Sequence, residues 1–352
     1  MRILLLTRYG RLGASSRVRS LQYLPFFESK GWKIDVSPLF SDGYLKALYS
    51  RRFKGLHVIA GYWRRIKSLL GVGKYDLIWI EKEIFPFLPA FAERLLVIFS
   101  VPYVADYDDA LFHRFDLNRY WLIRSLLGHK IDAVMRHATL VVAGNEYLAE
   151  RARVAGARQV EVVPTVVDLA RYEVVDTAVE YPLTVGWIGS PSTTSYLWVI
   201  GSAFETLIGE ADVRFVAVGA SEEQLTGLPI EVQRWSDDTE VQAIQAFDIG
   251  IMPLEDSPWE RGKCGYKLIQ YMACGLPVVA SPVGVNNQIV EHGVNGFLAR
   301  GAQEWKHALR RLISDKELRR SMGAEGRKRV ETQYSLQVQG PRLASMIRKA
   351  IR

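Results

Sequence analysis

The chain has 352 residues, which is enough for two domains because a single hydrophobic core rarely grows beyond about 250–300 residues. Apolar residues make up 49% and charged residues 24%, as in an ordinary globular protein, and the net charge is +7. The only cysteines are Cys264 and Cys274, which excludes a disulfide framework and favours a reducing compartment.

The longest apolar stretches are too short for a signal peptide or a membrane-spanning helix. The run after Arg2 has four apolar residues, and the run 95–104 is interrupted by Ser100 and Pro102. We therefore expect a cytoplasmic protein that is soluble or peripheral, on the inner face of the cell membrane.

Short apolar runs alternate with helical patterns along the chain. One set of predicted strands comprises 2–7, 33–39, 76–81, 102–107, 139–144 and 160–168. A second set comprises 183–190, 213–219, 231–235, 248–254, 277–282 and 296–299, and a basic helical region follows from 302 to 352. Such alternation predicts parallel sheets and the α/β class.

Two Rossmann-like domains follow from these two sets of strands. We predict an N-terminal, acceptor-binding domain at 1–172, a linker at 173–182 and a C-terminal, nucleotide-binding domain at 183–335, with a last helix at 336–352 that packs back on the first domain. Ligands of such sheets bind at the carboxyl ends of the strands.

The segment 44–74 is both basic and apolar. No acidic residue lies between Asp42 and Asp76, whereas eight lysines and arginines do. This composition is typical of a stretch that lies on an anionic membrane surface. A solvated helical face and a nucleic-acid patch are the alternatives, but no nucleic-acid module accompanies it, so no nucleic-acid partner is expected. The expected membrane contacts are Arg51, Arg52, Trp63, Arg64, Arg65 and Lys67.

Two loops of the first domain have candidate ligand-binding residues. In "RYGRLGASSRVR" (8–19), Gly13 permits a tight turn and Arg17 adds positive charge, which favours an anion-binding loop over simple turn glycines. It is not the dinucleotide fingerprint G-x-G-x-x-G. The second loop, "VADYDDALFHRFD" (104–116), follows a strand and is acidic.

This acidic loop supplies the predicted catalytic residues, which are Asp106, Asp108, Asp109 and His113. Clustered carboxylates hold a divalent metal, orient or deprotonate a hydroxyl, or cap the next helix. We favour contacts with a sugar or an acceptor hydroxyl and expect no metal.

The second domain has two loops suited to phosphate. In "VGWIGSPSTTSYL" (185–197), the backbone N–H groups near Gly189 and Ser190 either cradle a phosphate or belong to a helix cap. The stretch "RGKCGYKLIQYMACG" (261–275) gives the strongest signal. We predict that Gly265 begins a helix that ends at Gly275.

The predicted helix after Gly265 suits a nucleoside diphosphate. Lys263, Lys267 and Gln270 follow i, i+4 and i+7 spacing and are expected on one side of it, with Tyr266 beside them. Cations and a helix N-terminus hold phosphates, and a carboxamide bonds ribose hydroxyls without repelling them.

At these residues the chain resembles a retaining glycosyltransferase of family 4. The likeness is closest over "DIGIMPL" (248–254) and "KCGYKLIQYMACGLPVVASPVGVNNQIVEHGVNGFLA" (263–299). It implies a GT-B fold, in which two Rossmann-like domains face each other across a cleft.

That family usually has two glutamates, at positions that match Gly262 and Gln270 here, so the paired motif is degenerate. The resemblance implies that Gln270 contacts the donor ribose, with Lys263 or Lys267 near the diphosphate, and Glu260 and Arg261 are candidates for the donor-sugar contact.

The resemblance further implies transfer from a nucleoside-diphosphate sugar to a hydroxyl, with retention and without metal or cofactor. We expect the acceptor to be a lipid-linked or membrane-associated glycan of polysaccharide or glycoconjugate synthesis. Three alternatives remain: a non-catalytic nucleotide-sugar-binding protein, a nucleotide-sugar epimerase of the same fold, and a metal-dependent transferase built around Asp106 and Asp108.

Overall fold

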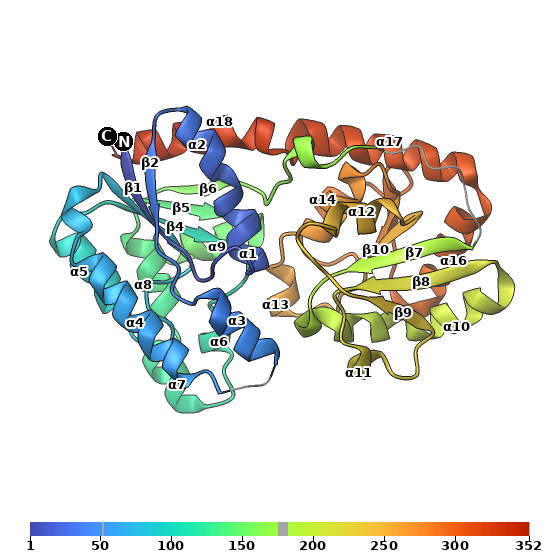
Figure 1. Ribbon diagram of the computed structural model, residues 1–352, viewed down its shortest axis with the longest axis horizontal. Coiled ribbons are helices and arrows are strands. Elements are labelled where there is room, and N and C mark those ends of the chain that lie inside the picture. The colour runs from blue at the N-terminus through green and yellow to red at the C-terminus, as the bar shows by residue number, and fades with distance from the viewer. Residues whose placement is uncertain (51–52, 175–181, 352) are drawn as a thin grey trace. The chain divides into compact units, whose positions relative to one another are not determined.

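The chain divides into two units in the computed structural model, which describes residues 1–50, 53–174 and 182–351 (Figure 1). Unit 1 comprises residues 1–165, 262–264 and 339–352, and unit 2 comprises residues 166–261 and 265–338. Residues 166–172 therefore group with unit 2, whereas we had expected the first domain to reach 172. Most of the expected linker lies outside the described residues.

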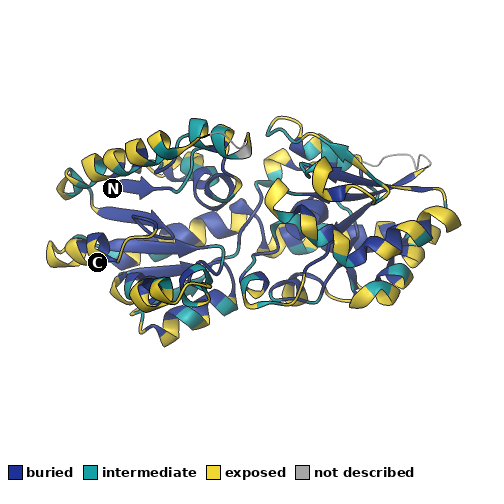
Figure 2. Cartoon of the chain, turned by 90° about the horizontal axis from the view of Figure 1, so that it is seen from below, coloured by how far each residue is buried: buried dark blue, intermediate teal, exposed yellow. Residues whose placement is uncertain are grey.

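Unit 1 is built on a parallel sheet whose order in the described residues is β2-β1-β3-β4-β5-β6. Its strands are β1 (Arg2–Leu6), β2 (Lys33–Val36), β3 (Leu77–Glu81), β4 (Tyr103–Tyr107), β5 (Leu140–Ala143) and β6 (Val160–Val162). Strands β3, β4 and β5 are buried along their whole length, because helices cover both faces of the sheet (Figure 2).

The helices of unit 1 lie between these strands in the chain. They are α1 (Ala14–Arg19), η1 (Leu21–Tyr23), α2 (Leu24–Ser29), α3 (Asp42–Tyr49), α4 (Gly55–Leu69), η2 (Val72–Lys74), α5 (Phe91–Ile98), α6 (His113–Asp116), α7 (Trp121–Leu127), α8 (Lys130–His137) and α9 (Glu146–Val154). The last helix, α18 (Leu336–Ile351), belongs to unit 1 from residue 339 onward.

Unit 2 repeats the architecture, with parallel strands in the order β12-β11-β10-β7-β8-β9. Its strands are β7 (Leu183–Ile188), β8 (Val213–Val218), β9 (Ile230–Gln233), β10 (Ile249–Met252), β11 (Val278–Ala280) and β12 (Gly296–Leu298). Its helices are η3 (Leu169–Arg171), η4 (Pro191–Ile200), α10 (Gly201–Glu210), α11 (Glu222–Leu225), α12 (Glu240–Gln245), α13 (Pro258–Arg261), α14 (Tyr266–Ala273), α15 (Asn286–Ile289), α16 (Gly301–Ser314) and α17 (Lys316–Gln333).

These sheets confirm the predicted α/β class and both Rossmann-like domains. Each predicted strand corresponds to one of β1 to β12 in the described residues. The chain direction along each sheet reverses once, between β1 and β3 in unit 1 and between β7 and β10 in unit 2. Ligands of doubly wound sheets bind at such switch points, beyond the carboxyl ends of the strands. The site is therefore sought in the loops that follow these four strands.

Candidate functional site

A buried lysine lies at the switch point of unit 1. Lys82 directly follows β3, and its Nζ atom lies 2.9 Å from Oδ1 of Asp108, 3.4 Å from Oδ2 of Asp109 and 3.0 Å from Oγ of Ser15. Its backbone has φ of 69°, a left-handed conformation that costs a residue with a side chain about 1–3 kcal/mol. These ion pairs, with the hydrogen bond to Ser15 of α1, link the segments that follow β1, β3 and β4.

The charges of this cluster shift one another. Burial alone would raise the pKa of Asp108, but Lys82 and the Ser15 hydroxyl hold it below its ordinary value. Burial and the neighbouring Asp108 raise the pKa of Asp109 despite Lys82. Burial would lower the pKa of Lys82, but the carboxylates of Asp108 and Asp109 together outweigh burial and raise this pKa above its ordinary value. The lysine is therefore a permanent cation at neutral pH.

Asp106 holds the sheet and α1 together. Its carboxylate accepts hydrogen bonds from Nε of Arg19 at 2.6 Å and from Nε1 of Trp79 at 3.2 Å, and the residue is 2% exposed. Burial raises its pKa, and Arg19 opposes that rise. Asp106 is therefore too buried to reach a substrate in its predicted catalytic role. Asp109, whose side chain is 31% exposed, is the most exposed carboxylate of the acidic loop.

Both ring nitrogens of His113 have partners. Nδ1 lies 2.9 Å from Oδ1 of Asp116, and Nε2 lies 2.7 Å from the hydroxyl of Tyr147. His113 begins α6, and the two contacts fix its half-buried ring beside the acidic loop.

The glycine loop after β1 is tightly folded. Gly13 is the N-cap of α1, its N–H donates to the Gly10 carbonyl at 3.1 Å, and a Cβ atom at Gly13 would lie 2.3 Å from Cβ of Tyr9. Arg17 is 5% exposed, and its guanidinium donates to the carbonyl of Arg11 at 3.3 Å. The arginine therefore closes its own loop, and its role in donor binding stays a prediction.

The segment 262–264 belongs to unit 1, and its packing explains why position 262 is a glycine and not the first glutamate of the family motif. Nδ2 of Asn145 donates to the carbonyls of Gly262 at 3.0 Å and Lys263 at 2.9 Å, and Sγ of Cys264 donates to the carbonyl of Asp108 at 3.0 Å. A Cβ atom at Gly262 would lie 2.5 Å from Cβ and 2.8 Å from the nitrogen of Ala110. No side chain fits at this position without a shift of the backbone.

The switch point of unit 2 is made of glycine and hydroxyl groups. Gly189 and Ser190 follow β7, and the N–H of Ser190 donates to Oγ1 of Thr193 at 3.3 Å. A Cβ atom at Gly189 would lie 2.2 Å from the Trp187 ring, so a larger residue would require that ring to move. The strand beside β7 is β10, and the chain continues from it through α13 to Gly265 and α14.

Helix α14 begins after Gly265, as predicted, but Lys263 is not part of it. Gly265 has φ of 65°, and this left-handed residue separates the helix from the segment 262–264. The prediction that Lys263 lies on the same side of this helix as Lys267 and Gln270 is therefore wrong. Lys267 lies in the first turn, with Nζ 5.3 Å from the centre of the Trp187 ring.

Gln270 belongs to a buried polar cluster and explains the second missing glutamate. Its Nε2 atom donates to the hydroxyl of Tyr172 at 2.9 Å and to Oε1 of Glu240 at 2.9 Å. Oε2 of Glu240 accepts from Nε1 of Trp235 at 2.7 Å. A glutamate at 270 would place a second carboxylate against Glu240 in a buried site, where like charges are costly. Tyr266, the first residue of α14, bonds the same Tyr172.

The two residues considered for the donor-sugar contact differ in accessibility. Glu260 is 8% exposed, and its carboxylate accepts hydrogen bonds from the hydroxyls of Tyr196 and Ser257. Nε of Arg261 donates to Oδ1 of Asp256 at 2.7 Å on the surface.

Sequence reasoning missed Lys82 and the pair Tyr172 and Glu240. Lys82 had a signal, since it lies in a loop that directly follows a predicted strand. Glu240 had none, because nothing local marks its approach to Gln270 from 30 residues away.

No set of three or more histidine, cysteine, aspartate or glutamate side chains in the described residues is arranged to hold a metal. Beside Asp108 and Asp109, the ammonium of Lys82 supplies the positive charge. Activity without a metal stays a prediction.

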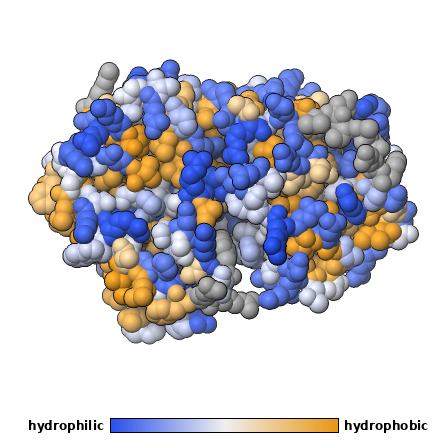
Figure 3. Space-filling view, viewed as in Figure 1, coloured by the Kyte–Doolittle hydropathy of each residue, from blue (hydrophilic) through white to orange (hydrophobic). Residues whose placement is uncertain are grey.

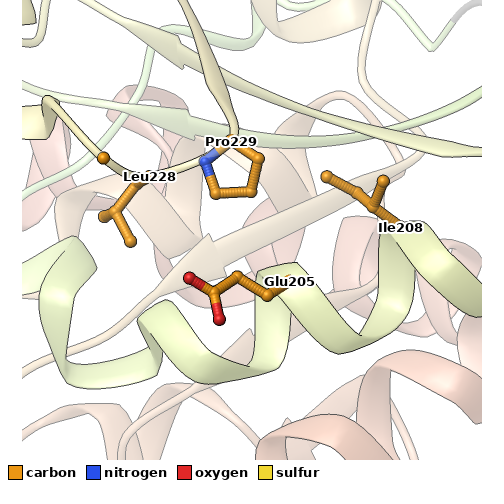
Figure 4. A pocket seen from close by; sticks show the side chains of 5 residues that line it. Glu205, Ile208, Leu228 and Pro229 are labelled. Atoms are coloured by element: carbon orange, nitrogen blue, oxygen red, sulfur yellow. The ribbon is translucent and has the colours of Figure 1, made fainter.

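A surface pocket of about 480 Å³ in unit 2 does not suit a diphosphate (Figure 4). It lies between α10 and the residues that precede β9, whereas Gly189 follows the carboxyl end of β7. Its ionisable group is the exposed Glu205, whose charge would repel phosphate.

The predicted membrane contacts are partly corrected. Arg51 and Arg52 lie outside the described residues. Trp63, Arg64 and Lys67 are exposed on α4, but Arg65 is 1% exposed and donates to the carbonyl of Thr7 at 2.6 Å. Arg65 points into the unit because α4 packs that side against the sheet. Within the described residues, no helix has both the length and the apolar character needed to cross a bilayer.

Comparisons with known proteins agree with this fold. Residues 182–315 match the family model described as group 1 glycosyl transferases. The whole chain has the GT-B fold: sucrose-phosphate synthase from Thermosynechococcus elongatus superposes with a TM-score of 0.74 over 99% of this chain and 98% of that chain, at 14% identity.

Two further relatives are similar over different lengths. HepE from Anabaena, in complex with UDP and glucose, has a TM-score of 0.74 over 99% of this chain and 100% of that chain, at 19% identity. N-acetyl-alpha-D-glucosaminyl L-malate synthase of Bacillus anthracis is 26% identical over 138 residues, which are 38% of this chain. The matched part spans about a third of that curated relative, 36% of its length.

Proposed function

We propose that the protein is a glycosyltransferase that moves a sugar from a nucleoside-diphosphate sugar to an acceptor hydroxyl, with retention of the anomeric configuration and without a metal. The observation that carries the proposal is the match of residues 182–315 to the group 1 glycosyl transferases, since this region contains the Ser190 loop and the Gly265 turn at one switch point. Retention and metal independence rest on the resemblance to family 4.

The proposed donor site in unit 2 uses neutral donors and one cation. The first turn of α14 has no acidic residue, and its N-terminus favours an anion. Lys267 adds a positive charge in that turn, and the hydroxyl of Ser190 follows the neighbouring strand. These groups would stabilise the departing diphosphate electrostatically. The base is not specified by these residues, but UDP is the first to test because HepE was crystallised with it.

The proposed chemistry needs no protein nucleophile. The acceptor oxygen forms a bond to the anomeric carbon on the face from which the phosphate oxygen departs, and the acceptor proton passes to a phosphate oxygen. In unit 1 we assign acceptor contacts to the acidic loop, with Asp109 as the carboxylate that meets the hydroxyl. Lys263 stays a predicted diphosphate contact. A lipid-linked or membrane-associated glycan is the proposed acceptor.

Calorimetry with UDP, GDP, ADP and TDP, each with and without EDTA, tests the donor site. We expect one nucleotide to bind independently of EDTA, and Lys267→Ala to weaken binding by about tenfold, because an ion pair with phosphate is charge-assisted. Lys263→Ala tests its predicted contact in the same way, and Lys316→Ala at the exposed start of α17 is the matched control. Absence of nucleotide binding, or binding that requires a metal, would contradict the proposal.

Turnover separates a transferase from a binding protein or an epimerase. Release of the nucleoside diphosphate should depend on both the donor and an acceptor, and the coupling constant of the new anomeric proton in NMR should match that of the donor. Asp109→Asn should reduce this rate by about a hundredfold, because the acceptor hydroxyl loses the carboxylate that orients it, while nucleotide affinity is kept.

A further inference from the structure

Helix α4 of unit 1 presents an apolar side to solvent. The exposed fractions are 73% for Leu56, 69% for Ile59, 60% for Trp63, 40% for Ile66 and 83% for Leu70. Their spacing of three and four residues places them on one side of the helix. Large side chains that remain exposed along four helical turns indicate a contact surface.

The opposite side of α4 is fixed in the unit, so this apolar side cannot turn inward. A Cβ atom at Gly61 would lie 2.4 Å from the carbonyl oxygen of Leu39. Arg65 reaches the carbonyl of Thr7 at the end of β1, and burial lowers the pKa of Arg65 to about 9. The helix thus lies against the sheet through Gly61 and Arg65.

Two more helices of unit 1 expose large apolar side chains. On and beside α5 these are Phe91, Leu95, Ile98 and Phe99, and on α7 they are Trp121, Leu122 and Leu126. In Figure 3 apolar side chains gather at the left edge, over α5, and at the lower left, over α7. Ile98, Phe99, Trp121 and Leu126 are each at least two-thirds exposed.

Aromatic contacts join these helices into one surface. The ring centres of Tyr62 on α4 and Phe85 lie 5.4 Å apart, and those of Phe85 and Phe91 on α5 lie 6.0 Å apart. Phe87 packs on Phe115 of α6 with ring centres 5.7 Å apart, and α7 follows α6 in the chain. Residues 84–91 therefore bridge α4, α5 and α6, and α6 in turn packs against α7.

The charges around this surface have one sign. The segments 43–75, 84–99 and 117–129 contain a single carboxylate, Glu93, which is 1% exposed and accepts from the N–H of Ile84 at 2.8 Å. Their exposed cations in the described residues are Lys46, Lys54, Arg64, Lys67, Lys74, Arg94, Arg119 and Arg124. We call α4, α5 and α7 with these side chains the apolar–basic surface.

We propose that the apolar–basic surface inserts its apolar side chains into the interfacial region of an anionic lipid bilayer. The inference rests on the membrane-associated acceptor of the proposed function, and it extends the membrane contact expected of the basic segment 44–74 to three helices. Tryptophans with lysines and arginines around them suit the boundary between headgroups and acyl chains. The basic side chains attract anionic headgroups.

The charges favour a bilayer over a second copy of the chain. A twofold interface would place the same surface on both sides, so its cations would face one another without carboxylates to pair with. The 3–4 spacing on α4 also resembles a helix-pairing seam, but such seams normally carry charges of both signs at their flanks.

Co-sedimentation with phosphatidylcholine vesicles, with and without phosphatidylglycerol, tests the proposal with the full chain and no nucleotide. We expect binding to anionic vesicles that weakens with salt. Partitioning should fall by about tenfold for Trp63→Ser and again for Trp121→Ser, since each removes a large apolar group that the bilayer would otherwise bury. Trp198→Ser in unit 2, where Trp198 is 50% exposed, is the matched control and should bind as the wild type does.

Three outcomes would overturn the proposal. The wild type could fail to bind anionic vesicles, the Trp63 and Trp121 variants could bind as well as the control, or light scattering could reveal a dimer that Trp63→Ser dissociates. Nucleotide calorimetry on the same samples separates the two proposals. Nucleotide binding without vesicle binding rejects only the membrane surface, and the reverse rejects only the donor site.

Discussion

The two units share one architecture but differ at the carboxyl ends of their strands. In unit 1 the loops after β1, β3 and β4 meet in a buried set of charges centred on Lys82. In unit 2 the loops after β7 and β10 present glycines and hydroxyls, and the buried polar contacts behind them are those of Gln270. The first edge is organised by ion pairs, whereas in the second the neutral donors of Gln270 and Trp235 bond a single carboxylate, that of Glu240.

This difference suggests how each edge serves its ligand. A phosphate is a strong anion, and it is best met by backbone N–H groups and a cation with no competing carboxylate nearby. A sugar hydroxyl is neutral, and it is oriented by a carboxylate whose charge is already balanced. Asp109 beside Lys82 has that character, whereas α14 has no carboxylate in its first turn.

The largest effect is expected at the cluster of charges around Lys82 in unit 1. Lys82→Met leaves Asp108 and Asp109 without their cation, which should cost about 3–5 kcal/mol of unfolding free energy at pH 7. The lowered pKa of Asp108 means that its stabilising ionisation is present above its ordinary pKa and is lost as the pH falls through the lowered value. In Lys82→Met the ionised form of Asp108 is no longer stabilised by a cation. The difference in unfolding free energy between the wild type and this variant should therefore shrink toward pH 4.

Urea denaturation of the wild type and Lys82→Met at pH 7 and pH 4 measures this loss. Arg2→Ala, which breaks the exposed Arg2–Asp35 pair, is the matched control and should cost less than about 1 kcal/mol. Equal losses for the two variants would mean that the unit 1 edge is not organised by its buried ion pairs.

The next largest effect is expected from a second carboxylate placed in the buried polar cluster of Gln270 in unit 2. Gln270→Glu restores the glutamate of the resembled family but brings two carboxylates together where Nε2 now lies 2.9 Å from Glu240. We expect a loss of about 2–4 kcal/mol at pH 7, since a buried donor is replaced by a like charge.

A double-mutant cycle isolates the cause of that loss. Glu240→Gln in the Gln270→Glu background should recover most of it, because one carboxylate and one amide are again paired. Gln242→Glu, on the exposed side of α12, is the control and should be near neutral. A loss that Glu240→Gln does not relieve would remove the electrostatic reason for glutamine at 270.

A steric reason is expected for the other missing glutamate. Gly262→Glu should cost about 2–3 kcal/mol, because the new Cβ atom would lie 2.8 Å from the backbone nitrogen of Ala110. Gly209→Glu is the control, since a Cβ atom there has no neighbour within 4 Å. Thermal unfolding of both variants measures the difference, and a stable Gly262→Glu variant would show that packing does not exclude the glutamate.

The sequence allowed the fold to be predicted because buried parallel strands are continuous apolar runs. β3 and β4 could be located for that reason, and Gly265 marked the start of α14. Side-chain direction was harder. Arg65 looks like a surface cation in the sequence, and only the close approach of α4 to Leu39 at Gly61 shows which side faces inward.

Long-range partners could not be predicted for a related reason. Lys263 was expected on the helix because the i, i+4 spacing continues backward from Lys267, but the left-handed Gly265 ends that periodicity. Glu240, the first residue of α12, comes close to Gln270 only through packing within unit 2, and no local sequence pattern encodes such a contact.

The smallest loss of unfolding free energy is expected from removing one helix cap in each unit. Asn145 and Asp315 both accept from the N–H three residues ahead, at 3.0 and 2.9 Å, at the starts of α9 and α17. Asp315→Ala removes only a cap and should cost about 1 kcal/mol. Asn145→Ala also frees the carbonyls of Gly262 and Lys263 and should cost about 2 kcal/mol. Urea denaturation of both variants measures this excess of about 1 kcal/mol, which is the contribution of the amide to holding the segment 262–264 on unit 1. Equal costs would mean that the segment is held without Asn145, by the contacts of Cys264 and Gly262 alone.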